Sequence, residues 1–185
     1  MTSEKDNQAS KETVLDVKVI PFRGIELPEV LRAQIIVANE ATFAWSAAMS
    51  EADFVNAQAE YYVMVRGRDE LLAYVSLHHI FDEATINTVY VDPAWRQLGL
   101  GLRVFDFVLA QLAARDILNL FLEVRAQNTP ALALYAAAGF EALVVRKGYY
   151  HDPADDAVIM QKRLLPLDVA ASQEGGAGDE SDSSN

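Results

Sequence analysis

The chain has 185 residues, a formal net charge of −12 and no cysteine. This length suits one domain with a core of ordinary size. The absence of cysteine excludes disulfides, thiolate metal sites and a cysteine nucleophile. The acidic charge argues against direct binding of nucleic acid and favours a basic partner, although solubility explains it equally well.

Composition divides the chain into three segments. Residues 1–13 are polar, and residues 167–185 combine Gly and Ser with five acids and no base. We expect a disordered leader and a disordered acidic tail at these ends, with one folded domain over residues 14–166. No segment has the pattern of a signal peptide or the length of an apolar membrane span, so we expect a cytoplasmic protein that does not enter the membrane.

The first third of the domain is predicted to form one strand and two helices. Residues 14–22 alternate in polarity as a strand does, and residues 27–39 carry apolar side chains at helical spacing. Ser50 is a candidate N-cap of a second, shorter helix. Trp45 lies between the two helices, where it is a candidate core anchor.

Three further strands, residues 61–66, 70–78 and 84–91, follow as an antiparallel meander. The turn Arg96-Gln97-Leu98-Gly99-Leu100-Gly101-Leu102 then leads into a helix. Because the first turn of a helix has free N–H groups and partial positive charge, this segment suits a phosphate or pyrophosphate. Taken alone, a Gly-x-Gly before a helix is equally common in loops that bind nothing.

The rest of the domain is predicted as strand 118–125, a helix with Thr129 as N-cap that ends at Gly139-Phe140, and strands 141–147 and 157–163. The sum is an α+β fold, with a mixed, mostly antiparallel sheet of six to seven strands and helices on both faces. The three histidines do not have the spacing of metal ligands, so we expect no metal site.

Two side chains are candidates for proton transfer. Glu123 lies in an otherwise apolar strand, where burial would disfavour its charged form and suit a general base; a structural ion pair with Arg125 fits the spacing equally well. Tyr135 lies on an alanine-rich helix, where a core role is the usual one.

Several motifs occur together: Arg96-x-x-Gly99-x-Gly101, Leu122-Glu123-Val124-Arg125-x-x-Asn128, Ala133-Leu134-Tyr135-x-x-x-Gly139-Phe140, Tyr149-Tyr150 and Asp156-Ala157-x-x-Met160. They resemble the motifs of the GNAT superfamily of N-acetyltransferases, and among them those of the RimI-type ribosomal-protein-alanine N-acetyltransferases. The resemblance implies transfer of an acetyl group from acetyl-CoA to the N-terminal α-amine of a protein, with a ribosomal protein that begins with Ala as the expected acceptor.

The resemblance also implies roles for single residues. Glu123 would be the general base and Tyr135 the general acid that protonates the CoA sulfur. Acetyl-CoA would be held by Val89, Tyr90, Val91, Arg96, Gln97, Leu98, Gly99, Leu100, Gly101, Leu102 and Asn128. The acceptor would lie against Trp45, Tyr149 and Tyr150, although simple hairpin packing explains the two tyrosines equally well.

Two features depart from the family pattern. Ala44 stands where relatives have a proline before the tryptophan, so we expect a less rigid loop. Leu98 and Leu102 stand where many relatives have basic residues, so we expect backbone amides to provide most of the pyrophosphate binding. Two other functions stay open: acetylation of a small amine such as an antibiotic or polyamine, and a non-catalytic module that binds acetyl-CoA.

Overall fold

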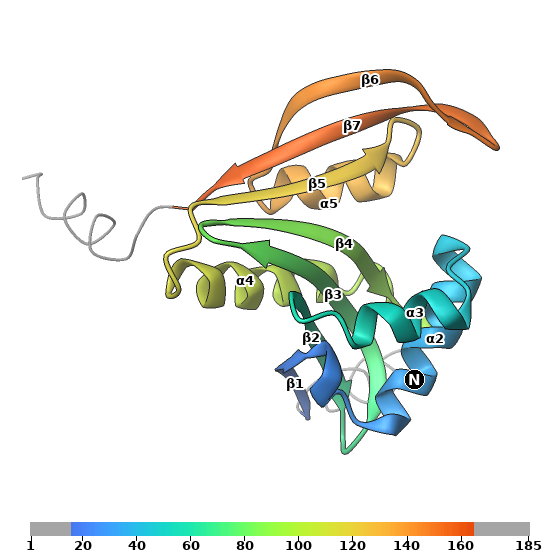
Figure 1. Ribbon diagram of the computed structural model, residues 1–185, viewed down its shortest axis with the longest axis vertical. Coiled ribbons are helices and arrows are strands. Elements are labelled where there is room, and N and C mark those ends of the chain that lie inside the picture. Colours follow the sequence, from blue (N-terminus) through green and yellow to red (C-terminus); the bar gives the residue numbers. More distant parts are fainter. Residues whose placement is uncertain (1–15, 165–185) are drawn as a thin grey trace, which may run out of the picture.

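The computed structural model describes residues 16–164 (Figure 1). The predicted leader and tail lie outside the described residues, as do the two ends of the predicted domain. The strands are β1 Val17–Arg23, β2 Ala59–Arg66, β3 Glu70–Ile80, β4 Glu83–Val91, β5 Asn119–Arg125, β6 Glu141–His151 and β7 Ala154–Arg163. The helices are α2 Glu29–Phe43, α3 Ala47–Phe54, α4 Leu100–Ala113 and α5 Thr129–Ala137, with short 3-10 turns η1 Gly24–Glu26 and η2 Pro93–Trp95.

All strands belong to one seven-stranded sheet in the order β1-β2-β3-β4-β5-β7-β6. Every neighbouring pair is antiparallel except β4 and β5, which are parallel. The helix between β4 and β5 is α4, as a parallel connection requires. The predicted α+β fold with a mixed, mostly antiparallel sheet is therefore confirmed.

The sheet buries a separate hydrophobic core on each face. Tyr62 and Met64 of β2 belong to the core shared with α4 and α5, whereas Tyr61, Val63 and Val65 belong to the core shared with α2 and α3. This alternation is the period of a strand that is covered on both sides. None of the helices within residues 16–164 combines the length and apolarity needed to cross a membrane.

The sheet opens between β4 and β5. The two strands pair only from Glu83 to Ile86 and from Asn119 to Leu122, after which each continues without the other (Figure 1). At this point the register between β3 and β4 shifts, because Ser76 pairs with Thr88 and Leu77 with Ile86. A bulge of this kind bends a strand and increases its twist, so it turns the end of β4 away from β5.

Two predicted helix caps are wrong by a few residues. Ser46, not Ser50, caps α3, since its side chain accepts a hydrogen bond from the N–H of Met49 at 3.2 Å. Ser50 is instead buried and accepts a hydrogen bond from the Asn39 side chain at 2.9 Å. Asn128, not Thr129, caps α5 through the N–H of Ala131. The cap of α5 is thus one residue earlier than predicted, and α3 begins four residues earlier.

Candidate active site

The turn before α4 presents free backbone donors. Gly99 is the N-cap of α4 with a φ of +77°, a left-handed conformation that glycine adopts without strain. The N–H groups from Gln97 to Leu102 donate no hydrogen bond to any residue within 16–164. These groups and the positive end of the helix dipole fit the predicted pyrophosphate.

The two glycines of this turn have different structural roles. A side chain at Gly99 would meet no neighbouring atom, so its backbone conformation is the constraint. A Cβ at Gly101 would lie 3.0 Å from a methyl carbon of Leu134, so this glycine allows α4 and α5 to pack closely. Of the pair, Gly101 therefore serves helix packing.

The end of β4 exposes amides along the opening of the sheet. The N–H of Asp92 donates to the carbonyl of Leu72 on β3 at 2.8 Å. Because donors alternate along an antiparallel strand, the N–H groups of Val89 and Val91 point away from β3, toward the side that β5 has left. The N–H of Tyr90 points toward β3, and its ring is stacked on Tyr74 in the core. Of the three predicted positions, only Val89 and Val91 offer free amides.

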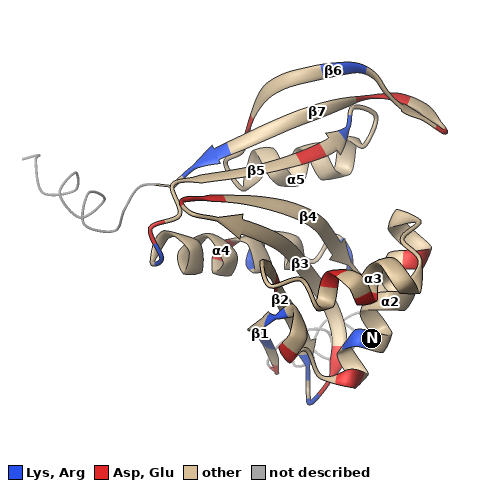
Figure 2. Cartoon of the chain, in the orientation of Figure 1, with Lys and Arg blue, Asp and Glu red and all other residues tan. Residues whose placement is uncertain are grey.

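Glu123 is exposed, and the predicted burial is wrong. Its neighbours Leu122 and Val124 are buried beneath α4 and α5, but Glu123 points to the opposite face and its side chain is 30% exposed. Its Oε1 accepts a hydrogen bond from the Tyr150 hydroxyl at 3.2 Å, and its Oε2 lies 3.5 Å from Nη1 of Arg146. Figure 2 shows basic residues on β6 and at the end of β5, just beyond the acidic segment of β5.

The alternative ion pair between Glu123 and Arg125 is absent among the described residues. Arg125 instead donates hydrogen bonds to the carbonyls of Asp152 and Pro153, at 3.2 and 2.9 Å. Its guanidinium lies 4.0 Å from the centre of the Tyr150 ring. Arg125 thus holds the β6–β7 hairpin and the aromatic ring that contacts Glu123.

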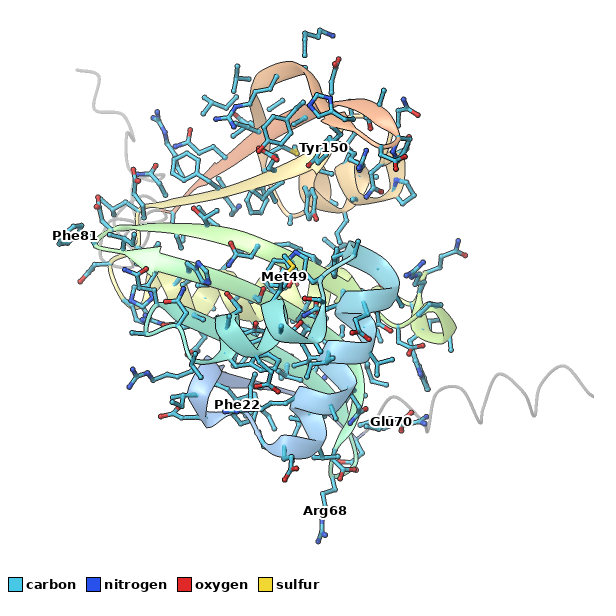
Figure 3. All side chains as sticks on the ribbon, turned by 45° about the vertical axis from the view of Figure 1, so that its right-hand side comes forward. Phe22, Met49, Arg68, Glu70, Phe81 and Tyr150 are labelled. Carbon is cyan, nitrogen blue, oxygen red and sulfur yellow. The ribbon has the colours of Figure 1, made fainter. Side chains whose placement is uncertain are left out.

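Tyr149 and Tyr150 are adjacent on β6, and Tyr150 contacts Glu123 (Figure 3 labels Tyr150). Their rings are perpendicular with centres 5.1 Å apart, and Tyr149 is 45% exposed. Partial burial, together with the charge of Glu123, raises the pKa of Tyr150 to about 12. The hydroxyl therefore stays protonated and remains a donor to the carboxylate at neutral pH.

Tyr135 packs within the core shared by α4 and α5. Its ring lies edge-on to Phe105, with centres 5.8 Å apart, and the residue is only 8% exposed. Burial raises the pKa of Tyr135 to about 12. Its hydroxyl donates no hydrogen bond to any residue within 16–164.

Trp45 belongs to neither core cluster. It is half-buried and lines a groove of about 340 Å³ with Met49, Ala52, Asp53 and Asn56. This position favours a role for Trp45 in a substrate groove over a role as a core anchor. The preceding Ala44 ends α2 with a φ of +55°, which a proline cannot adopt, so the departure from the family pattern has a structural reason.

Of the predicted acceptor residues, Tyr150 contacts the predicted base Glu123, whereas Trp45 lines the groove on α3. Arg146 also contacts Glu123, and the sequence did not indicate it. Within residues 16–164, no three His, Asp or Glu side chains form a group that could hold a metal ion. His78 Nε2 instead lies 2.7 Å from Asp53 Oδ1, and His79 Nδ1 lies 3.2 Å from Glu60 Oε1.

Known proteins share this sequence pattern. Residues 31–140 match the model of the acetyltransferase (GNAT) family. The chain is 32% identical over 150 residues to the [ribosomal protein bS18]-alanine N-acetyltransferase of Escherichia coli K12, covering 79% of this chain and 97% of that enzyme. It is 34% identical over 131 residues to the enzyme of the same name from Salmonella typhimurium, covering 69% of this chain and 84% of the other.

Solved structures share the fold. The crystal structure of the ribosomal-protein-S18-alanine N-acetyltransferase from Escherichia coli has a TM-score of 0.69 and 25% identity, covering 80% of this chain and 94% of that one. Arabidopsis thaliana NAA60 in complex with acetyl-CoA has a TM-score of 0.67 and 14% identity, covering 80% of this chain and 98% of that one. The second likeness concerns the fold alone.

Proposed function

The chain belongs to the acetyltransferase (GNAT) family, and we propose that it transfers an acetyl group from acetyl-CoA to the N-terminal α-amine of a protein, with a ribosomal protein that begins with alanine as its acceptor. One observation carries the proposal: the Glu123 carboxylate meets the Tyr150 hydroxyl beside the opening between β4 and β5. The enzymes named for ribosomal protein bS18 and alanine support this choice of acceptor.

The chemistry needs few side chains. Acetyl-CoA supplies an activated thioester, and Glu123 accepts a proton from the amine, directly or through one water, as the amine nitrogen attacks the thioester carbonyl carbon. The N–H groups of Val89 and Val91 stabilise the negative charge that develops on the carbonyl oxygen. Tyr135 gives its proton to the departing thiolate. The products are an N-acetylated terminus and the free thiol, and exchange with water restores both side chains.

The backbone and one polar side chain would hold the rest of acetyl-CoA. The amides from Gln97 to Leu102 would bind the pyrophosphate, with Arg96 and Arg103 as the nearby cations. Arg96 already donates to the carbonyl of Val91 at 3.0 Å, and Arg103 to that of Val17 at 3.0 Å. Asn128 uses its carbonyl oxygen to cap α5, which leaves its NH₂ group for the pantetheine arm.

The test uses mass spectrometry of short peptides that differ in their first residue, incubated with acetyl-CoA and the full chain. A polyamine and a peptide with a blocked N-terminus and a free lysine are included. We expect acetylation of free α-amines, with alanine-first peptides acetylated most. Acetylation of the polyamine or of lysine alone would overturn the proposal in favour of a different acceptor. The cytoplasmic location and the absence of nucleic-acid binding stay predictions.

A further inference from the structure

Glu123 has a cation, Arg146, beside it before any acceptor arrives. Its Oε1 is bound by the Tyr150 hydroxyl at 3.2 Å, and Nη1 of Arg146 lies 3.5 Å from Oε2. The carboxylate therefore already has a neutral donor on one oxygen and a positive charge near the other. An incoming ammonium group would seek the same oxygen atoms.

Arg146 is less firmly held than the other arginine of the site. Arg125 makes two hydrogen bonds to backbone carbonyls and lies 4.0 Å from a ring centre. Within residues 16–164, the Arg146 side chain has a contact with Glu123 and a more distant one, at 5.6 Å, with the Tyr149 ring, and it is 53% exposed. The side chain can therefore leave Glu123 without breaking any hydrogen bond among the described residues.

The backbone beside Arg146 is irregular. Arg146 pairs with Ala157, but the next paired residue of β6 is Tyr150, so the register with β7 shifts between them. Gly148 lies in this bulge with a φ of +60°. The bulge brings Arg146 and Tyr150 to the same carboxylate even though they are four positions apart on one strand.

Charge competition follows from the chemistry of the acceptor. A free α-amine has a pKa near 8, so most acceptor molecules are ammonium ions at neutral pH. We propose that Arg146 occupies the position of the acceptor ammonium on Glu123, and that an acceptor must displace it. Arg146 is thus a specificity-determining residue: a peptide, which makes further contacts along the groove, displaces it more easily than a small amine does. This inference rests on the proposed function.

The test compares Arg146→Ala and Arg146→Lys with the wild-type chain. For an alanine-first peptide, Arg146→Ala should lower KM about two- to fivefold, the range expected for loss of an exposed charge pair, with kcat within about twofold of wild type. KM for a polyamine should fall at least as much. Arg146→Lys keeps the cation and should stay near the wild-type KM. Arg68→Ala removes an equal charge from an exposed turn between β2 and β3 and should change neither constant.

A binding measurement separates competition from structural damage. Calorimetry with the free peptide and with its N-acetylated product should show tighter binding of the free peptide to Arg146→Ala and unchanged binding of the product, which has no ammonium. An unchanged or raised KM in Arg146→Ala, or equal tightening for both peptides, would overturn the inference while leaving the proposed function intact. A wild-type chain that acetylates no α-amine would overturn the proposed function itself.

Discussion

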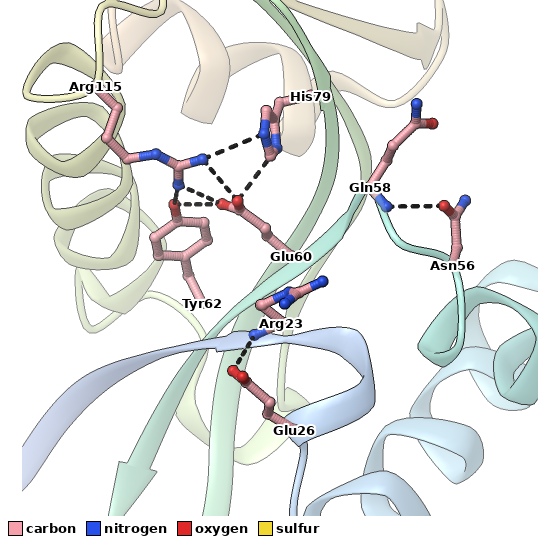
Figure 4. Close-up of polar contacts among 8 residues, drawn as sticks. All are labelled: Arg23, Glu26, Asn56, Gln58, Glu60, Tyr62, His79 and Arg115. Atoms are coloured by element: carbon pink, nitrogen blue, oxygen red, sulfur yellow. Dashed lines mark hydrogen bonds and ion pairs between the residues drawn. The ribbon is translucent and has the colours of Figure 1, made fainter.

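Two clusters in this molecule are built from the same three residue types, a glutamate, an arginine and a tyrosine, yet they differ in how completely the glutamate is bound. Glu60 is 13% exposed, Arg115 donates to both its oxygens at 2.7 and 2.8 Å, and the Tyr62 hydroxyl donates at 2.9 Å (Figure 4). Glu123 is 30% exposed, with one hydrogen bond at 3.2 Å and a cation at 3.5 Å.

This difference distinguishes a carboxylate that stabilises the fold from one whose binding partners can be replaced by a ligand. Burial alone would raise the pKa of Glu60, but the hydrogen bonds and charge of Arg115, with help from Tyr62 and His79, lower it below its usual value. His79 Nδ1 lies 3.2 Å from Glu60, although out of line for a hydrogen bond. Both oxygens of Glu60 already accept hydrogen bonds, whereas Oε2 of Glu123 accepts none within residues 16–164 and retains acceptor capacity.

The largest expected effect is on the open cluster. Glu123→Gln removes the proposed acceptor of the amine proton, so we expect kcat for peptide acetylation to fall about a hundredfold or more. Its free energy of unfolding should stay within about 0.5 kcal/mol of wild type because the position is exposed. Steady-state kinetics and urea unfolding measure the two quantities. A variant that keeps its rate would show that the two clusters do not differ in function.

The closed cluster should respond in the opposite way. Glu60→Gln should lower the free energy of unfolding by about 1–2 kcal/mol at pH 7 and leave kcat unchanged. Because the pKa of Glu60 is lowered in the folded state, its stabilisation exists above the unfolded pKa and is lost as pH falls through the folded one. Urea unfolding should therefore show the difference from wild type shrinking below about pH 4.

A matched control for this variant is Glu70→Gln. Glu70 also pairs with an arginine, Arg66 at 2.6 Å, but on the exposed surface. An exposed pair of this kind should cost less than about 1 kcal/mol. Equal losses in the two variants would show that the Glu60 cluster stabilises the fold no more than an exposed ion pair does.

The smallest effect is expected at the tyrosine of the open cluster. Tyr150→Phe removes one hydrogen bond to Glu123 and keeps the ring beneath Arg125, so kcat/KM should fall about two- to tenfold. The pKa of Tyr150 is raised to about 12, so its hydroxyl remains a donor and the loss should be the same from pH 7 to pH 10. A pH profile of both proteins checks this, and a loss confined to low pH would contradict it.

Local patterns predicted more of the fold than of the site. The strands β2 to β4 and the glycine turn before α4 depend on neighbouring residues, so they follow from the sequence. The exposure of Glu123 depends on whether a helix covers that face of β5, which no pattern within the strand records. The contact of Arg146 depends on a register shift in β6, and such shifts leave no clear signal in hydrophobic alternation.

The close contact at Gly101 also fixes the distance between the turn before α4 and Tyr135 on α5. Leu134, which a Cβ at that position would meet, immediately precedes Tyr135 on α5. The turn that presents the free amides and Tyr135, the proposed acid, are therefore joined through one helix–helix contact, with no loop between them. In the proposed complex, the distance between them would have to match the length of the pantetheine arm, and a bulkier residue at position 101 would change that distance by displacing α5.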